Sequence, residues 1–106
     1  MTEARERLPD RRASESFTFE FDNLRFAATV SRFDDGRLAE LFLSNHKHGN
    51  QLDTLARDIA IVFSFAVQHG ADANAIRKAL GRDSQGRPLG PLAKALDLLA
   101  DQAGQP

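Results

Sequence analysis

The sequence predicts an α+β fold, with a three-stranded antiparallel β-meander followed by a long central helix and two shorter helices. Residues 17–43 contain three short segments separated by two tight-turn sequences, and residues 51–99 carry apolar side chains at helical spacing. The 106 residues are 42% hydrophobic and 27% charged, which is typical of one folded domain with a single core. We therefore expect a single domain over residues 15–103, preceded by a flexible charged N-terminal arm over residues 1–14.

Alternating side chains and turn residues indicate the meander. In residues 17–21, three phenylalanines alternate with polar residues, which is the period of a half-buried strand. The Asp-Asn pair at 22–23 tolerates a left-handed backbone and favours a turn. A second strand is expected over residues 25–32. The Asp-Asp-Gly sequence at 34–36 then predicts the next turn, and residues 37–43 form the third strand.

A long helix is expected over residues 51–69, with Asn50 as its N-cap and Gly70 as its C-terminal stop. Its expected apolar stripe contains six residues: Leu52, Leu55, Ala56, Ile59, Phe63 and Val67. Ile61 and Phe65 lie off this stripe, so the helix should be buried on a second side as well. Either the last helix or a second copy of the chain, in a homodimer, can cover that side.

Two shorter helices complete the expected domain. Asp72 can cap a helix that ends near Leu80, and residues 81–90 form a polar, glycine-containing loop. Pro91 suits the first turn of the last helix, where its missing N–H costs nothing. The buried stripe of that helix is expected to contain Leu92, Ala95, Leu96 and Leu99.

Composition excludes several functions for these 106 residues. Cysteine is absent, which removes thiol catalysis and thiolate metal sites. The net charge of −1 produces no field that favours nucleic acid, and Tyr and Trp are absent as stacking platforms, so no nucleic-acid partner is expected. Neither a secretory signal nor an apolar run long enough for a membrane helix is present. We expect a cytoplasmic protein with no cofactor and no membrane association.

The polar loop before the long helix is the first candidate site. His46, Lys47, His48, Gly49 and Asn50 precede a helix N-terminus, where unpaired N–H groups and the helix dipole favour an anion. Lys47 adds a positive charge and Gly49 allows close approach of the backbone. A nucleotide or another phosphate is one interpretation of this loop. The alternative is a solvated turn in which Asn50 only caps the helix.

Metal and acid–base chemistry are weaker interpretations of the same region. His46 and His48 lack a third ligand nearby, and His69 lies roughly 28 Å away at the far end of the helix, so no metal site is expected. Glu40 shares a strand face with Leu38 and Phe42 and can form an ion pair with Lys47 that holds the loop against the sheet. No nucleophile or oxyanion hole accompanies Glu40, so no catalytic residue is expected.

Arg82 and Arg87 lie in the second polar loop, which precedes Pro91. They are further candidate ligand-binding residues, although the loop matches no known phosphate-binding motif. A solvated linker is the alternative interpretation.

Three groups of residues together form a recognisable pattern. They are the run from Asp35 to Leu43, then His46, Lys47 and Gly49, and, in and after the long helix, Ala60, Ile61, Ser64, Gln68 and Gly70. In these residues the sequence resembles the TSCPD domain found near the C-terminal end of cobalamin-dependent (class II) ribonucleotide reductases. The resemblance implies an accessory or binding module linked to deoxynucleotide and DNA synthesis, with a ribonucleotide reductase as partner.

The resemblance does not imply the reaction of a ribonucleoside-diphosphate reductase. The radical-forming cysteines, the cobalamin site and the main substrate pocket of those enzymes lie outside the TSCPD domain. We therefore expect a chain that binds an anionic ligand such as a nucleotide and is not catalytic alone. The alternative is a protein–protein interaction or homodimerisation domain without a small-molecule ligand.

Overall fold

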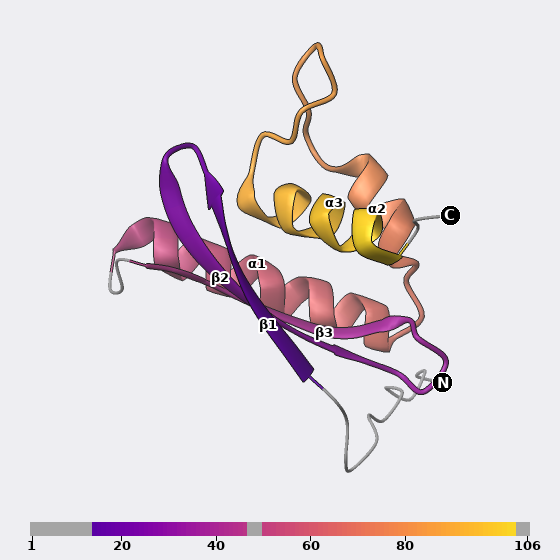
Figure 1. Cartoon of the computed structure of the whole chain (residues 1–106). Helices are drawn as coiled ribbons and strands as arrows, with labels where there is room; N and C mark the ends of the chain where they lie inside the picture. Colours follow the sequence, from indigo (N-terminus) through magenta and orange to yellow (C-terminus); the bar gives the residue numbers. More distant parts are fainter. Residues whose placement is uncertain (1–13, 47–49, 104–106) are drawn as a thin grey trace.

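The computed structural model describes residues 14–46 and 50–103, and it confirms the α+β class. The elements follow in the expected order: β1 (Ser14–Phe21), β2 (Leu24–Arg32), β3 (Leu38–Asn45), α1 (Gln51–Gln68), α2 (Ala73–Ala79) and α3 (Pro91–Ala103). Figure 1 shows α1 running beside the twisted sheet, with α3 and α2 stacked next to it. Nearly all of the N-terminal arm expected over residues 1–14 lies outside the described residues.

The sheet has the strand order β1-β2-β3, and both pairings are antiparallel. Asp22 and Asn23 adopt φ angles of 55° and 63°, as a two-residue type I′ hairpin turn requires. The register places Phe19 opposite Phe26, so one face of the first two strands is apolar. The two expected turns and the meander are therefore confirmed.

The core lies between this face of the sheet and helices α1 and α3. Phe26, Val30 and Leu41 from the sheet are almost completely buried, and Phe63 from α1 packs in the same cluster. Four residues of α3 complete it, and they are those of the expected stripe: Leu92, Ala95, Leu96 and Leu99.

Helix α1 is attached to the outer edge of β3 by hydrogen bonds to the strand backbone. The Ser64 hydroxyl accepts from the Leu41 N–H at 2.8 Å and lies 3.0 Å from the Leu41 carbonyl and 2.9 Å from the Ala60 carbonyl. The Gln68 amide donates to the Ala39 carbonyl at 2.8 Å. These bonds satisfy strand groups that β2 does not reach, because β3 is an edge strand.

The expected stripe of α1 is only partly correct. Ala56, Phe63 and Val67 are buried, but Leu55 and Ile59 are 56% and 40% exposed. The helix turns Ser64 and Gln68 toward the β3 edge, and this rotation carries Leu55 and Ile59 toward solvent. For the same reason, α1 lies along an edge strand and not across the centre of the sheet.

The helix ends agree with the capping signals. Asn50 caps α1 by accepting from the Asp53 N–H, and Asp72 caps α2 by accepting from the Asn74 N–H. Gly70 follows α1 with φ of 102°, a conformation that stops the helix at little cost only for glycine. In the parts of the chain that the structure describes, no helix is long and apolar enough to cross a membrane.

Replacing Ser64 with alanine tests the attachment of α1 to the sheet. The change leaves the Leu41 N–H, which is 2.8 Å from the hydroxyl, without that partner. We expect the free energy of unfolding to fall by about 1–3 kcal/mol, even though alanine is the better helix former. Urea unfolding measures the change. Ser84→Ala, at an exposed loop position, is the matched control, and equal midpoints for both variants would contradict the structural role of Ser64.

Candidate functional site

The β3–α1 junction holds the first candidate site, and only part of it lies within the described residues. His46 is exposed at the end of β3, and its backbone N–H donates to the Arg25 carbonyl at 2.8 Å. The Asn50 side chain accepts from the Asp53 N–H at 2.7 Å and donates to the Asn45 side chain at 3.4 Å. Lys47, His48 and Gly49 lie outside the described residues.

A buried carboxylate already occupies the first turn of α1. Asp53 is 4% exposed, and its side chain accepts from the Asn45 N–H at 2.8 Å and from the Arg57 guanidinium at 2.9 Å. The carboxylate therefore attaches the start of α1 to β3 and places a negative charge near the positive end of the helix dipole. The positive end of α1 is thus already occupied by a carboxylate, which is paired with Arg57.

Glu40 lies at the other end of β3. It is half-buried on the outer face of the sheet, opposite Ser31. Asn45 lies five positions further along β3, which is about 17 Å in an extended strand. The expected ion pair between Glu40 and Lys47 includes a residue outside the described part of the chain.

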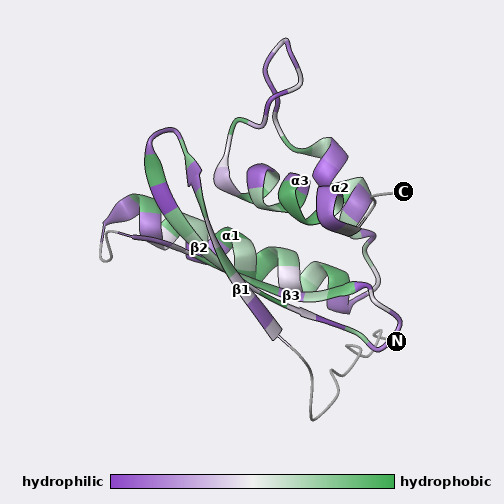
Figure 2. Ribbon diagram, viewed as in Figure 1, coloured by the Kyte–Doolittle hydropathy of each residue, from purple (hydrophilic) through white to green (hydrophobic). Residues whose placement is uncertain are grey.

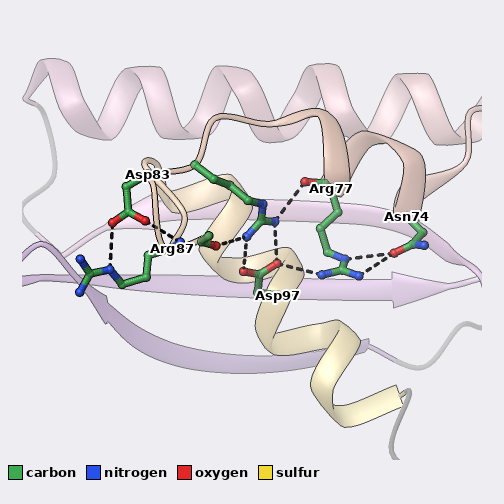
Figure 3. A network of polar contacts seen from close by, with 7 residues as sticks. Asn74, Arg77, Asp83, Arg87 and Asp97 are labelled. Atoms are coloured by element: carbon green, nitrogen blue, oxygen red, sulfur yellow. Dashed lines mark hydrogen bonds and ion pairs between the residues drawn. The ribbon is translucent and has the colours of Figure 1, made fainter.

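Arg82 and Arg87, both in the α2–α3 connection, pair with the carboxylates of Asp97 on α3 and Asp83 in the connection itself. Figure 3 shows the pair of Arg87 with Asp83 and the contact of Arg77 with Asp97. The two Nη atoms of Arg82 donate to both carboxylate oxygens of Asp97 at 2.8 and 2.9 Å, and one also donates to the Arg77 carbonyl. Asp97 accepts a further bond from Arg77 at 3.1 Å. Arg87 pairs with Asp83 at 2.9 Å across the small hairpin.

These contacts change the ionisation of the groups. The hydrogen bond from Arg82 is the main cause that lowers the pKa of Asp97 below its ordinary value of 3.8, and Arg77 adds to it. Asp97 in turn raises the pKa of Arg82. The backbone N–H of Arg87 is the first cause of the lowered pKa of Asp83. The arrangement stabilises charged pairs and joins α2, the loop and α3.

The candidate residues form two separate groups. The hairpin with Arg82 and Arg87 projects beside α2 and α3, at a distance from the β3–α1 junction in Figure 1. His69 lies after the last turn of α1, about 27 Å from the start of that helix. Among the described residues, no group of three or more histidines and carboxylates is placed to hold a metal ion.

The structure also contains a pocket that the sequence did not indicate. It has a volume of about 280 Å³ and lies between the β2–β3 turn, the end of α1, α2 and α3. Arg32, Arg37 and Arg77 are among its lining residues, together with apolar side chains that include Val67 and Leu99. Because these arginines come from distant parts of the chain, no local motif marks them. Only the close spacing of Arg32 and Arg37 around a turn was visible in the sequence.

Comparison with known proteins gives one informative similarity. The chain is 33% identical over 66 residues to a vitamin B12-dependent ribonucleotide reductase from Bradyrhizobium diazoefficiens. The matched segment covers 62% of this chain and 5% of the reductase, so the chain spans about a twentieth of that relative's length. No family model and no solved structure matches the chain. The chain is therefore similar to a small segment of a ribonucleotide reductase.

Asp97→Asn tests the ion pairs of Asp97 with Arg77 and Arg82, which connect α2, the loop and α3. At about pH 7 we expect the free energy of unfolding to fall by about 1–3 kcal/mol, because two guanidinium groups lose a charged acceptor. The pKa of Asp97 is lowered in the folded chain, so its stabilisation is complete above the ordinary value near 3.8 and is lost as the pH falls through the lower folded-state value. Urea unfolding across this acidic range should show the wild type and the variant converging.

Asp101→Asn, at an exposed position of the same helix, is the control. A gap between Asp97→Asn and wild type that stays constant on acidification would show that the charge of Asp97 is not the source of its contribution.

Proposed function

We propose that this chain is an accessory module associated with ribonucleotide reduction, which acts by binding and is not catalytic alone. The similarity to a segment of a vitamin B12-dependent ribonucleotide reductase carries the proposal. These 106 residues contain no cysteine, so they supply no thiol for radical chemistry or for transfer of reducing equivalents. We therefore assign to the module a contribution by binding and not by thiol chemistry.

The finer part of the proposal is that the module is TSCPD-like. Ser64 and Gln68, two of the residues that carry this resemblance, attach α1 to β3 through the backbone of Leu41 and Ala39. A structural task of this kind explains a shared polar residue in an otherwise apolar helix. The resemblance at these positions therefore supports a common architecture and leaves ligand binding to other residues.

The exposed side of α1 is the surface that we assign to a protein partner. Leu55 and Val62 are 56% and 61% exposed, and Ile59, Ile61 and Phe65 are also exposed. Figure 2 shows that hydrophobic residues predominate along the middle of α1, whereas its ends are hydrophilic. A contiguous apolar helix face on a small domain is typical of an interaction site. We propose that it contacts the reductase.

A second candidate function is self-association through the same surface. Leu55, Ile59 and Val62 follow one another at spacings of four and three residues, which is the pattern of a two-helix seam. Two antiparallel copies of α1 would bring Ile59 of each copy next to Val62 of the other, an isologous arrangement around a two-fold axis.

Capture of a reductase tests the main proposal. The immobilised chain, incubated with extract of its native cells, should retain a vitamin B12-dependent ribonucleotide reductase identified by mass spectrometry. Val62→Gln should reduce the captured amount about tenfold, because a polar amide then faces the apolar contact. Leu89→Gln is the matched control, since Leu89 is 62% exposed but lies outside α1.

The outcomes separate the two candidates. Failure to capture a reductase, or equal capture by both variants, contradicts the main proposal. Light scattering with the purified chain addresses the second candidate: a mass of two chains in the wild type and of one chain in Val62→Gln would assign the surface to a homodimer.

The ligand proposed for the β3–α1 junction is a nucleotide or another phosphate, with His46, Lys47, His48, Gly49 and Asn50 as the contacting residues. Arg82 and Arg87 lie on the hairpin beside α2 and α3, apart from His46 and Asn50 (Figure 1), and the pairing of both arginines with carboxylates favours a structural task for them. Glu40 lies five positions before Asn45 on β3. Lys47 supplies the positive charge of the loop and is the residue to test.

Lys47→Ala should abolish the chemical-shift changes that millimolar ATP produces at His46 and Asn50 in the wild type, while the remaining spectrum stays unchanged. The charge of Lys47 is the expected cause, so Lys78→Ala, at an exposed position on α2, serves as the control for loss of one positive charge. If ATP causes no shift at the junction in the wild type, the loop is a capped turn and not a ligand site.

A further inference from the structure

The pocket beside α2 has an apolar part of its lining, here called its floor, and three lining arginines, Arg32, Arg37 and Arg77, here called its rim. Its apolar lining comes from the end of α1 and from α3 and includes Val67, Leu96 and Leu99. Its volume of about 280 Å³ lies near the lower end of the range for small-molecule sites. The pocket therefore suits a small ligand with an apolar body.

The arginines of the rim differ in how fully their charges are balanced. Arg37 pairs with Asp35 at 2.7 Å, and Asp97 is shared between Arg77 and Arg82. Arg32 donates one hydrogen bond to the Gly36 carbonyl at 2.9 Å and, within residues 14–46 and 50–103, forms no ion pair. The positive charge of the rim is thus concentrated at Arg32, and Asp72 is the acidic residue in the lining.

Arg77 is oriented before any ligand arrives. Two of its nitrogens donate to the Asn74 side chain at 3.1 and 2.9 Å, and the third donates to Asp97. Its planar guanidinium is therefore fixed against α2 and α3. A pre-oriented guanidinium loses little freedom when it binds an oxyanion, and guanidinium groups match the geometry of phosphate and carboxylate.

We propose that this pocket binds a small organic anion that carries one phosphate or carboxylate on an apolar or aromatic body. The body rests on Val67, Leu96 and Leu99, and the anionic group lies at the rim, where Arg32 is its main contact and Arg77 a second one. The carboxylate of Asp72 disfavours ligands with several negative charges.

Binding of a small anion at this pocket is a property of the chain itself and does not depend on its association with a reductase. It also names residues other than those of the β3–α1 junction. Arg32 and Asn50 lie in different parts of the chain, so a titration that follows individual amides distinguishes the two sites.

Phenyl phosphate and benzoate are the probes, and phenol and inorganic phosphate, the two parts of phenyl phosphate, are the controls. Titration into the isotope-labelled chain should shift the amides of residues 36–38, 71–74 and 96–100 with phenyl phosphate or benzoate, and only weakly with phenol or inorganic phosphate alone. Comparison of the two anions distinguishes phosphate from carboxylate as the preferred group.

Arg32→Gln should weaken binding of the preferred probe about tenfold, which is the usual effect of losing one charge-assisted contact. Arg25→Gln is the matched control, because Arg25 lies on the same strand about 23 Å away. A second variant, Ala71→Glu, adds a negative charge at an exposed lining position and should weaken binding without removing the bond from Arg32 to Gly36.

Several results would overturn the proposal. They are the absence of shifts at these amides with both anions, equal shifts from inorganic phosphate alone, and equal affinities for wild type, Arg32→Gln and Ala71→Glu. Ala79→Glu, an exposed position at the end of α2, controls for the added charge. Capture of the reductase by the same chain is measured separately, so failure of either experiment leaves the other proposal open to its own test.

Discussion

The free edge of β3 is the constraint on which the rest of the structure depends. Backbone groups on an edge strand need partners, and a buried group without one costs about 1–3 kcal/mol. Here α1 supplies them from its own side chains, because Asp53, Ser64 and Gln68 bond to the backbone of β3. These bonds determine how α1 is rotated. The rotation exposes Leu55 and Val62 and brings the end of the helix to the arginine-lined pocket.

The parts of the fold that the sequence predicts correctly are those encoded locally. The Asp22-Asn23 turn, the Asn50 and Asp72 caps and the Gly70 stop each involve residues within a few positions of one another. The rotation of α1 is encoded differently. Ser64 meets Leu41 across 23 residues, and Gln68 meets Ala39 across 29. Hydrophobic periodicity cannot report such contacts, so it assigned Leu55 and Ile59 to the core.

The candidate sites follow the same division. The polar loop before α1 was visible as a sequence pattern, whereas Arg82 could not be matched to Asp97, its carboxylate partner 15 residues further along the chain. The composition of the loop suggested ligand binding for Arg82, but its guanidinium connects α2 to α3 through the Arg77 carbonyl and Asp97. Conversely, Arg77 gave no signal and Arg32 showed only its close spacing to Arg37, because only the packing of the β2–β3 turn against α2 and α3 places these residues around one cavity.

The pKa values of three acidic residues are those of carboxylates held in structural pairs. A catalytic carboxylic acid needs a pKa raised toward the working pH, usually by burial without a cation. Hydrogen bonds lower the pKa values of Asp35, Asp83 and Asp97 instead, chiefly from the backbone N–H groups of Arg37 and Arg87 for the first two and from the Arg82 guanidinium for Asp97. Each carboxylate is thereby kept charged and engaged in a turn or an interhelical pair. The bond from Arg77 to Asp97 also fixes one of the arginines that line the pocket beside α2. Carboxylates arranged in this way hold a cation in place, as the anion site that we propose at this pocket requires.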